Sequence, residues 1–185
     1  MITTLATLIA IPTLITYIRK SNSKYVIRAA FDVGSGATKM CVAVVERCVE
    51  RGQMRSYVRK ILYDDQTSVL LRCDMSISED GKTLSDSILK KAEKTLQDYL
   101  NIAVETYGCD SFGGIATAVF RKAKNGETFL KSRILKNLGL EIKLVDQKTE
   151  GRIGWQSASN AFSTINQDAS IDANDIVSWD SGGGS

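Results

Sequence analysis

Histidine is absent from the 185 residues of this chain, and proline occurs once, at Pro12. Without histidine the chain has no Ser-His-Asp or Cys-His catalysis, no metal site built on imidazole, and no histidine-based pH switch. Any acid–base chemistry must therefore use carboxylates or lysine.

The cysteines are also few, and their spacing is uninformative for metal binding. The four of them are Cys41, Cys48, Cys73 and Cys109, with no Cys-x-x-Cys pair, so a zinc site is not expected. Cys41 and Cys73 lie in apolar runs, and we expect both to be buried as small hydrophobic side chains. Free thiols in a reducing compartment are expected, with two disulfides as the alternative in an exported chain.

A strong charge imbalance is likewise missing. The net charge is +3, and the basic residues are dispersed along the sequence, so no specific nucleic-acid partner is expected. The hydrophobic content of 43% and the charged content of 24% are those of a globular domain with a core.

Residues 1–20 form an apolar amino-terminal segment. Residues 2–18 are mainly aliphatic side chains and threonines, and Arg19, Lys20 and Lys24 follow them. This length is near the lower limit for a membrane helix, and positive charge behind it places the following domain in the cytoplasm. We expect a membrane anchor on a cytoplasmic domain, with a packing helix as the alternative.

The remaining sequence alternates between strand and helix patterns. Apolar runs predict an early group of strands over 25–33, 39–45 and 55–63, with a weaker run over 68–73. Apolar residues spaced by four predict a helix over 84–100. Later elements are expected at 111–118 (strand), 125–138 (helix capped by Asn125 and ended by Gly139), 141–145 (strand), 148–161 (helix) and 175–180 (strand). This order predicts an α/β fold, in which a three-stranded antiparallel meander is followed by alternating helices and strands in one mixed sheet.

A glycine-rich turn joins the first two predicted strands. Gly34, Ser35 and Gly36 can bring backbone amides against a phosphate oxyanion. Asp32, at the end of the strand, is placed to hold Mg²⁺. An ordinary hairpin is the alternative interpretation.

A second acid-plus-glycine phrase follows the last predicted strand. Asp180 precedes three glycines and a serine that could approach phosphate closely: Gly182, Gly183, Gly184 and Ser185. A flexible linker is the alternative. Asp180 is the second candidate ligand for Mg²⁺.

Two charged residues lie between these phrases. Arg121 follows a predicted strand and could bind phosphate through two hydrogen bonds. Glu150 falls in the first turn of a predicted helix, near the carboxyl edge of the sheet, where Arg152 could pair with it or with phosphate. The alternatives are a solvated arginine and a glutamate that only stabilises the helix dipole.

Together these phrases resemble the exopolyphosphatase and guanosine pentaphosphate phosphohydrolase family of the actin-like ATPase superfamily. The resemblance runs from Ile27 to Ser185 and rests on four phrases in family order. The turn after Asp32 looks like Asp-x-Gly-Ser-Asn-Ser, and 116–125 looks like Ala-Thr-Ser-Ala-x-Arg-x-Ala-x-Asn. Residues 149–152 look like Glu-Glu-Ala-Arg, and 180–185 look like Asp-Ile-Gly-Gly-Gly-Ser.

The resemblance implies Glu150 as the catalytic base for attack of water on a terminal phosphoryl group. It implies Asp32 and Asp180 as Mg²⁺ ligands, with Arg121 and the glycine amides on the phosphate oxygens. Linear polyphosphate or guanosine pentaphosphate would be the substrate. Residues 25–185 would be the family's first domain, with the second domain absent and an exposed cleft wall that favours a homodimer.

Two other functions remain open at this point. One is an ATP-binding half of the actin-like or kinase-like type. The other is a non-catalytic binding module, which the changed hairpin would favour, because Gly36 and Ala37 stand where the family has asparagine and serine.

Overall fold

A five-stranded mixed sheet forms the centre of the molecule. The structure is a computed structural model that describes residues 24–165. The strands are β1 (Tyr25–Val33), β2 (Ala37–Glu50), β3 (Gln53–Ser68), β4 (Ser111–Ala116) and β5 (Ile142–Leu144), in the sheet order β3-β2-β1-β4-β5. β1, β2 and β3 pair antiparallel as a meander, whereas β4 is parallel to β1 and β5 is parallel to β4. The predicted fold class is therefore confirmed.

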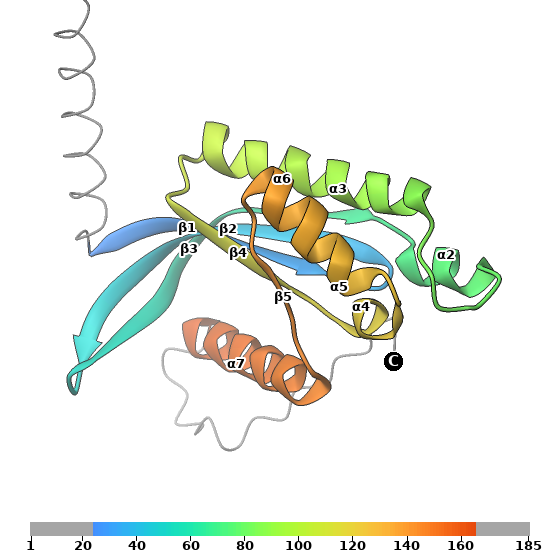
Figure 1. The fold of residues 1–185 in the computed structure, drawn as a ribbon. Helices are drawn as coiled ribbons and strands as arrows, with labels where there is room; N and C mark the ends of the chain where they lie inside the picture. The colour runs from blue at the N-terminus through green and yellow to red at the C-terminus, as the bar shows by residue number, and fades with distance from the viewer. Residues whose placement is uncertain (1–23, 166–185) are drawn as a thin grey trace, which may run out of the picture.

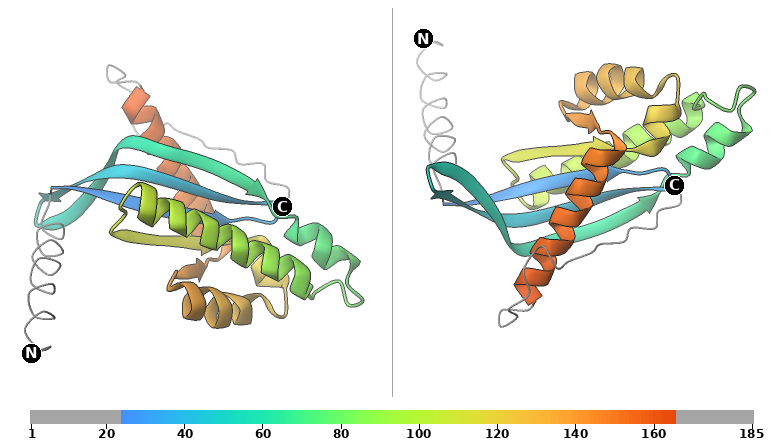
Figure 2. Two further views of the ribbon diagram at one scale, coloured as in Figure 1. Left: turned by 90° about the horizontal axis from the view of Figure 1, so that it is seen from above. Right: turned by 90° about the horizontal axis from the view of Figure 1, so that it is seen from below.

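Helical segments connect the later strands and cover both faces of this sheet. In chain order they are α2 (Leu71–Ile77), α3 (Asp86–Asn101), η1 (Ile102–Thr106), α4 (Ala118–Lys122), α5 (Gly126–Phe129), η2 (Leu130–Leu135), α6 (Lys136–Leu138) and α7 (Gln147–Ile165). Figure 1 shows α3 and the α5–α6 segment on one face, with α7 on the other. The view from below shows α7 crossing the strands obliquely (Figure 2).

The main core lies between the sheet and α3 with the α5–α6 segment. Phe31 and Val33 of β1 are almost completely buried there, together with Leu96 of α3 and Ile134 of η2. In α3 the buried residues recur at helical spacing, and the Ser85 hydroxyl accepts a hydrogen bond from the Ile88 amide as the helix begins. Because side chains alternate along β1, Asp32 lies on the opposite face of the sheet, which α7 covers.

The β2–β3 hairpin is longer than the sequence pattern predicts. Its two turn residues, Arg51 and Gly52, have φ angles of 51° and 76°, the left-handed conformation that two-residue hairpin turns require. Beyond the part of β2 that pairs with β1, the two strands continue toward this turn as a ribbon whose side chains are mostly exposed. Exposed strand residues give no alternating apolar pattern, so the prediction stopped short of the turn.

The apolar run over 68–73 is not a separate strand, because Ser68 ends β3 and the residues from Leu71 onward belong to a helix. Leu71 and Met75 are buried four residues apart, while Leu70 and Cys73 are exposed. This is the period of a helix, and α2 begins at Leu71. The expected burial of Cys73 is therefore wrong, and Cys41 is only half-buried, whereas Cys109 is buried.

Asn125 has a different role from the one predicted. It precedes α5, but its side chain makes no capping hydrogen bond there. Instead its Oδ1 accepts a hydrogen bond from the Leu84 amide at 3.1 Å, and its Nδ2 donates to the Leu84 carbonyl at 2.8 Å. Asn125 thus ties the segment after α4 to the start of α3. Gly139 does end the α6 segment, with φ of 64°.

Two predicted segments lie outside the described residues: the apolar segment 1–20 and the strand 175–180. Among the helices that the structure describes, none is both long and apolar enough to span a membrane.

Candidate functional site

The carboxyl ends of the parallel strands β1, β4 and β5 bring three chain segments to one edge of the sheet. β1 leads into the Gly34–Gly36 turn, β4 leads into α4, and β5 leads into α7. In open α/β sheets this edge is where ligands bind. These segments carry three of the candidate residues: Ser35, Arg121 and Glu150. The fourth, Asp32, lies near the end of β1.

The glycine turn is held from both sides. The Gly34 amide donates to the Ala37 carbonyl at 3.0 Å, which closes the turn. The carbonyls of Ser35 and Gly36 accept hydrogen bonds from the Arg72 and Val69 amides at 2.9 and 3.0 Å. The amides of Ser35 and Gly36 donate to no described residue. Of the three predicted amides, these two are therefore the ones without an acceptor among the described residues.

A side chain at the first glycine of this turn would be crowded, whereas one at the second would not. A Cβ on Gly34 would lie 3.1 Å from the Ala37 carbonyl oxygen, whereas one on Gly36 would meet nothing within 4 Å. Open space at Gly36 is compatible with a ligand that approaches the backbone there.

Arg121 and Glu150 form an ion pair across this edge of the sheet. Arg121 Nη1 donates to Glu150 Oε2 at 2.8 Å and to the Val145 carbonyl at 2.7 Å. Both side chains are partly exposed, at 27% and 34%. The glutamate partner is therefore Arg121, and the predicted pairing with Arg152 does not occur in the structure.

The start of α7 fixes the position of Glu150. Asp146 Oδ1 accepts a hydrogen bond from the Thr149 amide at 2.7 Å, and the Glu150 amide donates to the Asp146 carbonyl at 2.9 Å. The hydrogen bond from the Thr149 amide is the main reason that the pKa of Asp146 lies below its ordinary value, with a smaller contribution from the charge of Arg121. Asp146 is a functional candidate that was not predicted from the sequence. The available signal was an acidic residue two positions before the predicted helix 148–161.

β5 is attached to β4 at the point where both strands end. The Val145 amide donates to the Ala116 carbonyl at 3.1 Å. The Val145 carbonyl then receives Arg121, which comes from the helix that follows β4. Backbone contacts of this kind leave no trace in the residue types, so the sequence could not reveal Val145.

Asp32 is the candidate metal ligand that the structure describes. It is half-buried, one residue before the end of β1, and its Cα lies opposite Ile115 of β4 and Lys39 of β2. Within residues 24–165 no group of three acidic, cysteine or histidine side chains could enclose a metal ion. One carboxylate still fits Mg²⁺, which usually takes one or two protein carboxylates and completes its shell with water and substrate phosphates.

The other predicted ligands lie outside the described residues. They are Asp180, proposed for the metal, and Gly182, Gly183, Gly184 and Ser185, proposed for phosphate.

The mixed sheet, with a glycine turn after its first strand and an Arg–Glu pair at the ends of its parallel strands, makes this an α/β domain with its candidate site at the carboxyl edge of the sheet. The sequence model of the Ppx/GppA phosphatase family matches residues 55–185. The chain belongs to this family.

Solved structures agree on the fold. A Ppx/GppA enzyme from Aquifex aeolicus superposes with a TM-score of 0.60 at 19% identity, over 75% of this chain and 42% of that one. An exopolyphosphatase from Cytophaga hutchinsonii gives 0.56 at 13% identity, over 72% and 38%. The chain thus spans less than half the length of these relatives. No curated protein matches its sequence.

Proposed function

We propose that this chain carries the catalytic-base half of a phosphoanhydride hydrolase, which acts on the terminal phosphoryl group of inorganic polyphosphate or guanosine pentaphosphate. The observation that carries the proposal is the Arg121–Glu150 pair at the carboxyl edge of the sheet. Family membership supports the phosphatase class. Polyphosphate and guanosine pentaphosphate are the substrates that the sequence resemblance implies.

Glu150 would be the general base in this reaction. Its side chain is 34% exposed, so a water molecule can reach it. A base in hydrogen-bonding reach of that water orients it and takes its proton as it attacks phosphorus. The start of α7 would hold the backbone of Glu150 in place during this step, and Arg121 would orient the carboxylate for as long as their contact persists.

Arg121 and the Ser35–Gly36 amides would bind the phosphate oxygens. Arg121 already donates to one carboxylate oxygen of Glu150, and a phosphate oxygen offers the same kind of acceptor. The guanidinium can therefore exchange the carboxylate for phosphate, or contact both at once, because it has five donors. Donors aimed at developing negative charge lower the barrier to phosphoryl transfer.

Asp32 would hold Mg²⁺ at the end of β1, together with Asp180. When bound, the ion would neutralise charge on the phosphate oxygens. Asp32 lies on the face of the sheet that α7 covers, and Glu150 lies in the first turn of α7.

The test measures phosphate release with Mg²⁺ from polyphosphate, guanosine pentaphosphate and ATP. We expect Glu150→Gln to lower release from the first two by at least about 100-fold, because the amide cannot accept the proton. Glu141→Gln, on an exposed glutamate just before β5, is the matched control. Release that survives Glu150→Gln would refute the proposed base. Turnover of ATP alone would favour an ATP-binding half, and no turnover even with a complementing second domain would favour a non-catalytic module.

A further inference from the structure

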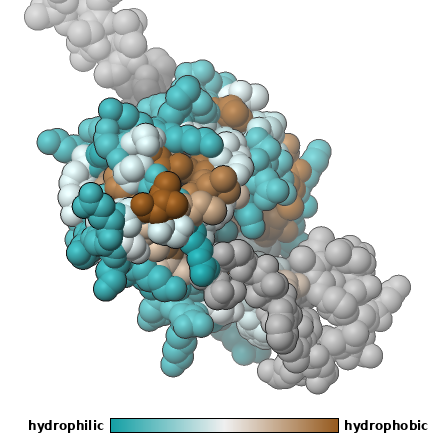
Figure 3. All heavy atoms as spheres, turned by 90° about the vertical axis from the view of Figure 1, so that its right-hand side faces the viewer, coloured by the Kyte–Doolittle hydropathy of each residue, from teal (hydrophilic) through white to brown (hydrophobic). Residues whose placement is uncertain are grey.

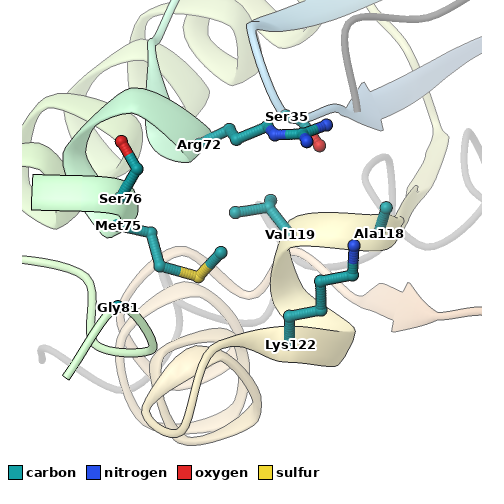
Figure 4. A pocket seen from close by; sticks show the side chains of 8 residues that line it. All are labelled: Ser35, Arg72, Met75, Ser76, Gly81, Ala118, Val119 and Lys122. Atoms are coloured by element: carbon teal, nitrogen blue, oxygen red, sulfur yellow. The ribbon is translucent and has the colours of Figure 1, made fainter. Parts of the chain in front are cut away.

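A cavity of about 140 Å³ opens beside the glycine turn. It lies between that turn, α2 and α4, as Figure 4 shows. Its lining residues are Ser35, Arg72, Met75, Ser76, Gly81, Ala118, Val119 and Lys122. This volume exceeds the space of a single water molecule several times over, so a small polyatomic ion can enter.

The charged side chains around the cavity are both cations. Arg72 from α2 and Lys122 from α4 line it, and none of its described lining residues is acidic. In Figure 4 the Lys122 ammonium and the Arg72 guanidinium extend to the same side, where Ser35 lies. Arg72 already has a partner in the structure, whereas the charge of Lys122 at the same opening favours an anion.

Lys122 differs from the cations next to it in the sequence. Arg121 pairs with Glu150, and Lys124 pairs with Asp80 at 2.8 Å. Lys122 forms no ion pair with any residue in the described range. Its charge is therefore available at the cavity.

The hydroxyl groups of the cavity are not equivalent. The Ser76 hydroxyl donates a hydrogen bond to the Cys73 carbonyl at 2.7 Å, so its hydrogen atom is already used within α2. The Ser35 hydroxyl makes no hydrogen bond with a described residue and can donate to a ligand. Met75 and Val119 supply the apolar part of the wall.

The face of the molecule that carries α2 shows an apolar area bordered by hydrophilic residues (Figure 3).

The cavity continues the proposed phosphate site. Ser35 belongs to both, and Lys122 follows Arg121 directly, so their Cα atoms are about 3.8 Å apart. Arg121 faces Glu150 and Lys122 faces the cavity. A ligand with several linked phosphates can therefore place one phosphate at each cation.

We propose that this cavity binds a non-reacting phosphoryl group of the substrate, with Lys122, Arg72 and the Ser35 hydroxyl as its donors. The inference rests on the proposed function, because it assumes that the reacting phosphate lies at Arg121 and Glu150. It assigns the preference for chain-like phosphates over orthophosphate to Lys122.

The test compares two probes by calorimetry in the presence of Mg²⁺: a methylene-bridged tripolyphosphate, which cannot be hydrolysed, and orthophosphate. We expect Lys122→Gln to weaken binding of the bridged probe about tenfold and to leave orthophosphate within about twofold, since one charge-assisted hydrogen bond is lost. Ser76→Ala controls for a change in the cavity wall, and Lys136→Gln, on exposed α6, controls for net charge.

Three results would overturn the inference: no binding of the bridged probe to the unsubstituted chain, no loss in Lys122→Gln, or an equal loss for both probes. Thermal unfolding of each variant verifies that it is folded. Because the bridged probe is not hydrolysed, this binding result is independent of turnover. Release that survives Glu150→Gln would refute the proposed base without affecting the binding result. Loss of the binding difference would refute the cavity proposal without affecting the release assay.

Discussion

Arg121 and Glu150 are 29 residues apart in the sequence, and their side chains meet at 2.8 Å. The same guanidinium nitrogen donates to the Val145 carbonyl. Arg121 therefore joins three elements, because it extends from α4, contacts the residue after β5, and pairs with the first turn of α7. Any ligand that draws Arg121 away from Glu150 also changes how the start of α7 is held.

Arg121 should affect turnover more than stability. We expect Arg121→Met to lower phosphate release by about 100-fold and Arg121→Lys by about tenfold, because lysine keeps the charge but loses the planar fork. Lys136→Met, on the exposed surface of α6, should leave release unchanged. Initial rates over a range of substrate concentrations measure the effect. Full activity in Arg121→Met would show that this guanidinium does not contact the reacting phosphate.

Asp146 should give α7 a stability that depends on pH. Its folded-state pKa is lower than the ordinary value of 3.8. The contribution is therefore complete above that value and is lost as the pH falls through the lower, folded-state pKa. At neutral pH we expect Asp146→Ala to melt at a lower temperature than the unsubstituted chain, and to show faster amide exchange at the start of α7.

Asp146→Ser separates the cap from the charge. A serine hydroxyl also caps a helix, but it does not titrate. The melting-temperature difference between the unsubstituted chain and Asp146→Ala should narrow on acidification below about pH 4, whereas the difference between the serine and alanine variants should persist. A gap between the unsubstituted chain and Asp146→Ala that stays constant down to the lowest accessible pH would contradict the proposed cap.

The neighbouring glycines of β4 should respond differently to alanine. A Cβ on Gly114 would lie 2.6 Å from the Phe31 carbonyl oxygen and 2.7 Å from Ile142 Cδ1, so β1 or β5 must move. A Cβ on Gly113 meets only the Glu141 carbonyl, at 3.7 Å, which is ordinary contact. We expect Gly114→Ala to lower the free energy of unfolding by roughly 1–3 kcal/mol. Gly113→Ala should change it by at most about 0.5 kcal/mol.

Urea unfolding followed by circular dichroism measures both glycine variants. The comparison is well matched, because the two residues are adjacent in one strand and undergo the same chemical change. Equal stability of Gly114→Ala and Gly113→Ala would mean that β1, β4 and β5 pack less closely than the structure shows.

Much of the fold follows from local sequence patterns. The period of α3, the turn after β1 and the Gly139 stop each depend on residues within a few positions of one another. The order of these elements was enough to predict the mixed sheet. Local patterns failed at α2, where Leu70 and Leu71 extended an apolar run although only Leu71 is buried. They failed again at Asn125, which pairs with Leu84 of a distant segment.

For the candidate site, the sequence by itself determined which residue types follow each strand: an acid and glycines after β1, an arginine after β4 and a glutamate in the first turn of α7. Only the tertiary structure decided which of them meet. The Arg121–Glu150 pair exists because β4 and β5 lie side by side and parallel, so that the helices after them begin at the same edge. The cavity at Lys122 likewise depends on α2 packing beside α4. The periodicity and the caps of a helix depend on residues that are close in sequence. These contacts, in contrast, join distant segments that only the packing of the strands and helices brings together.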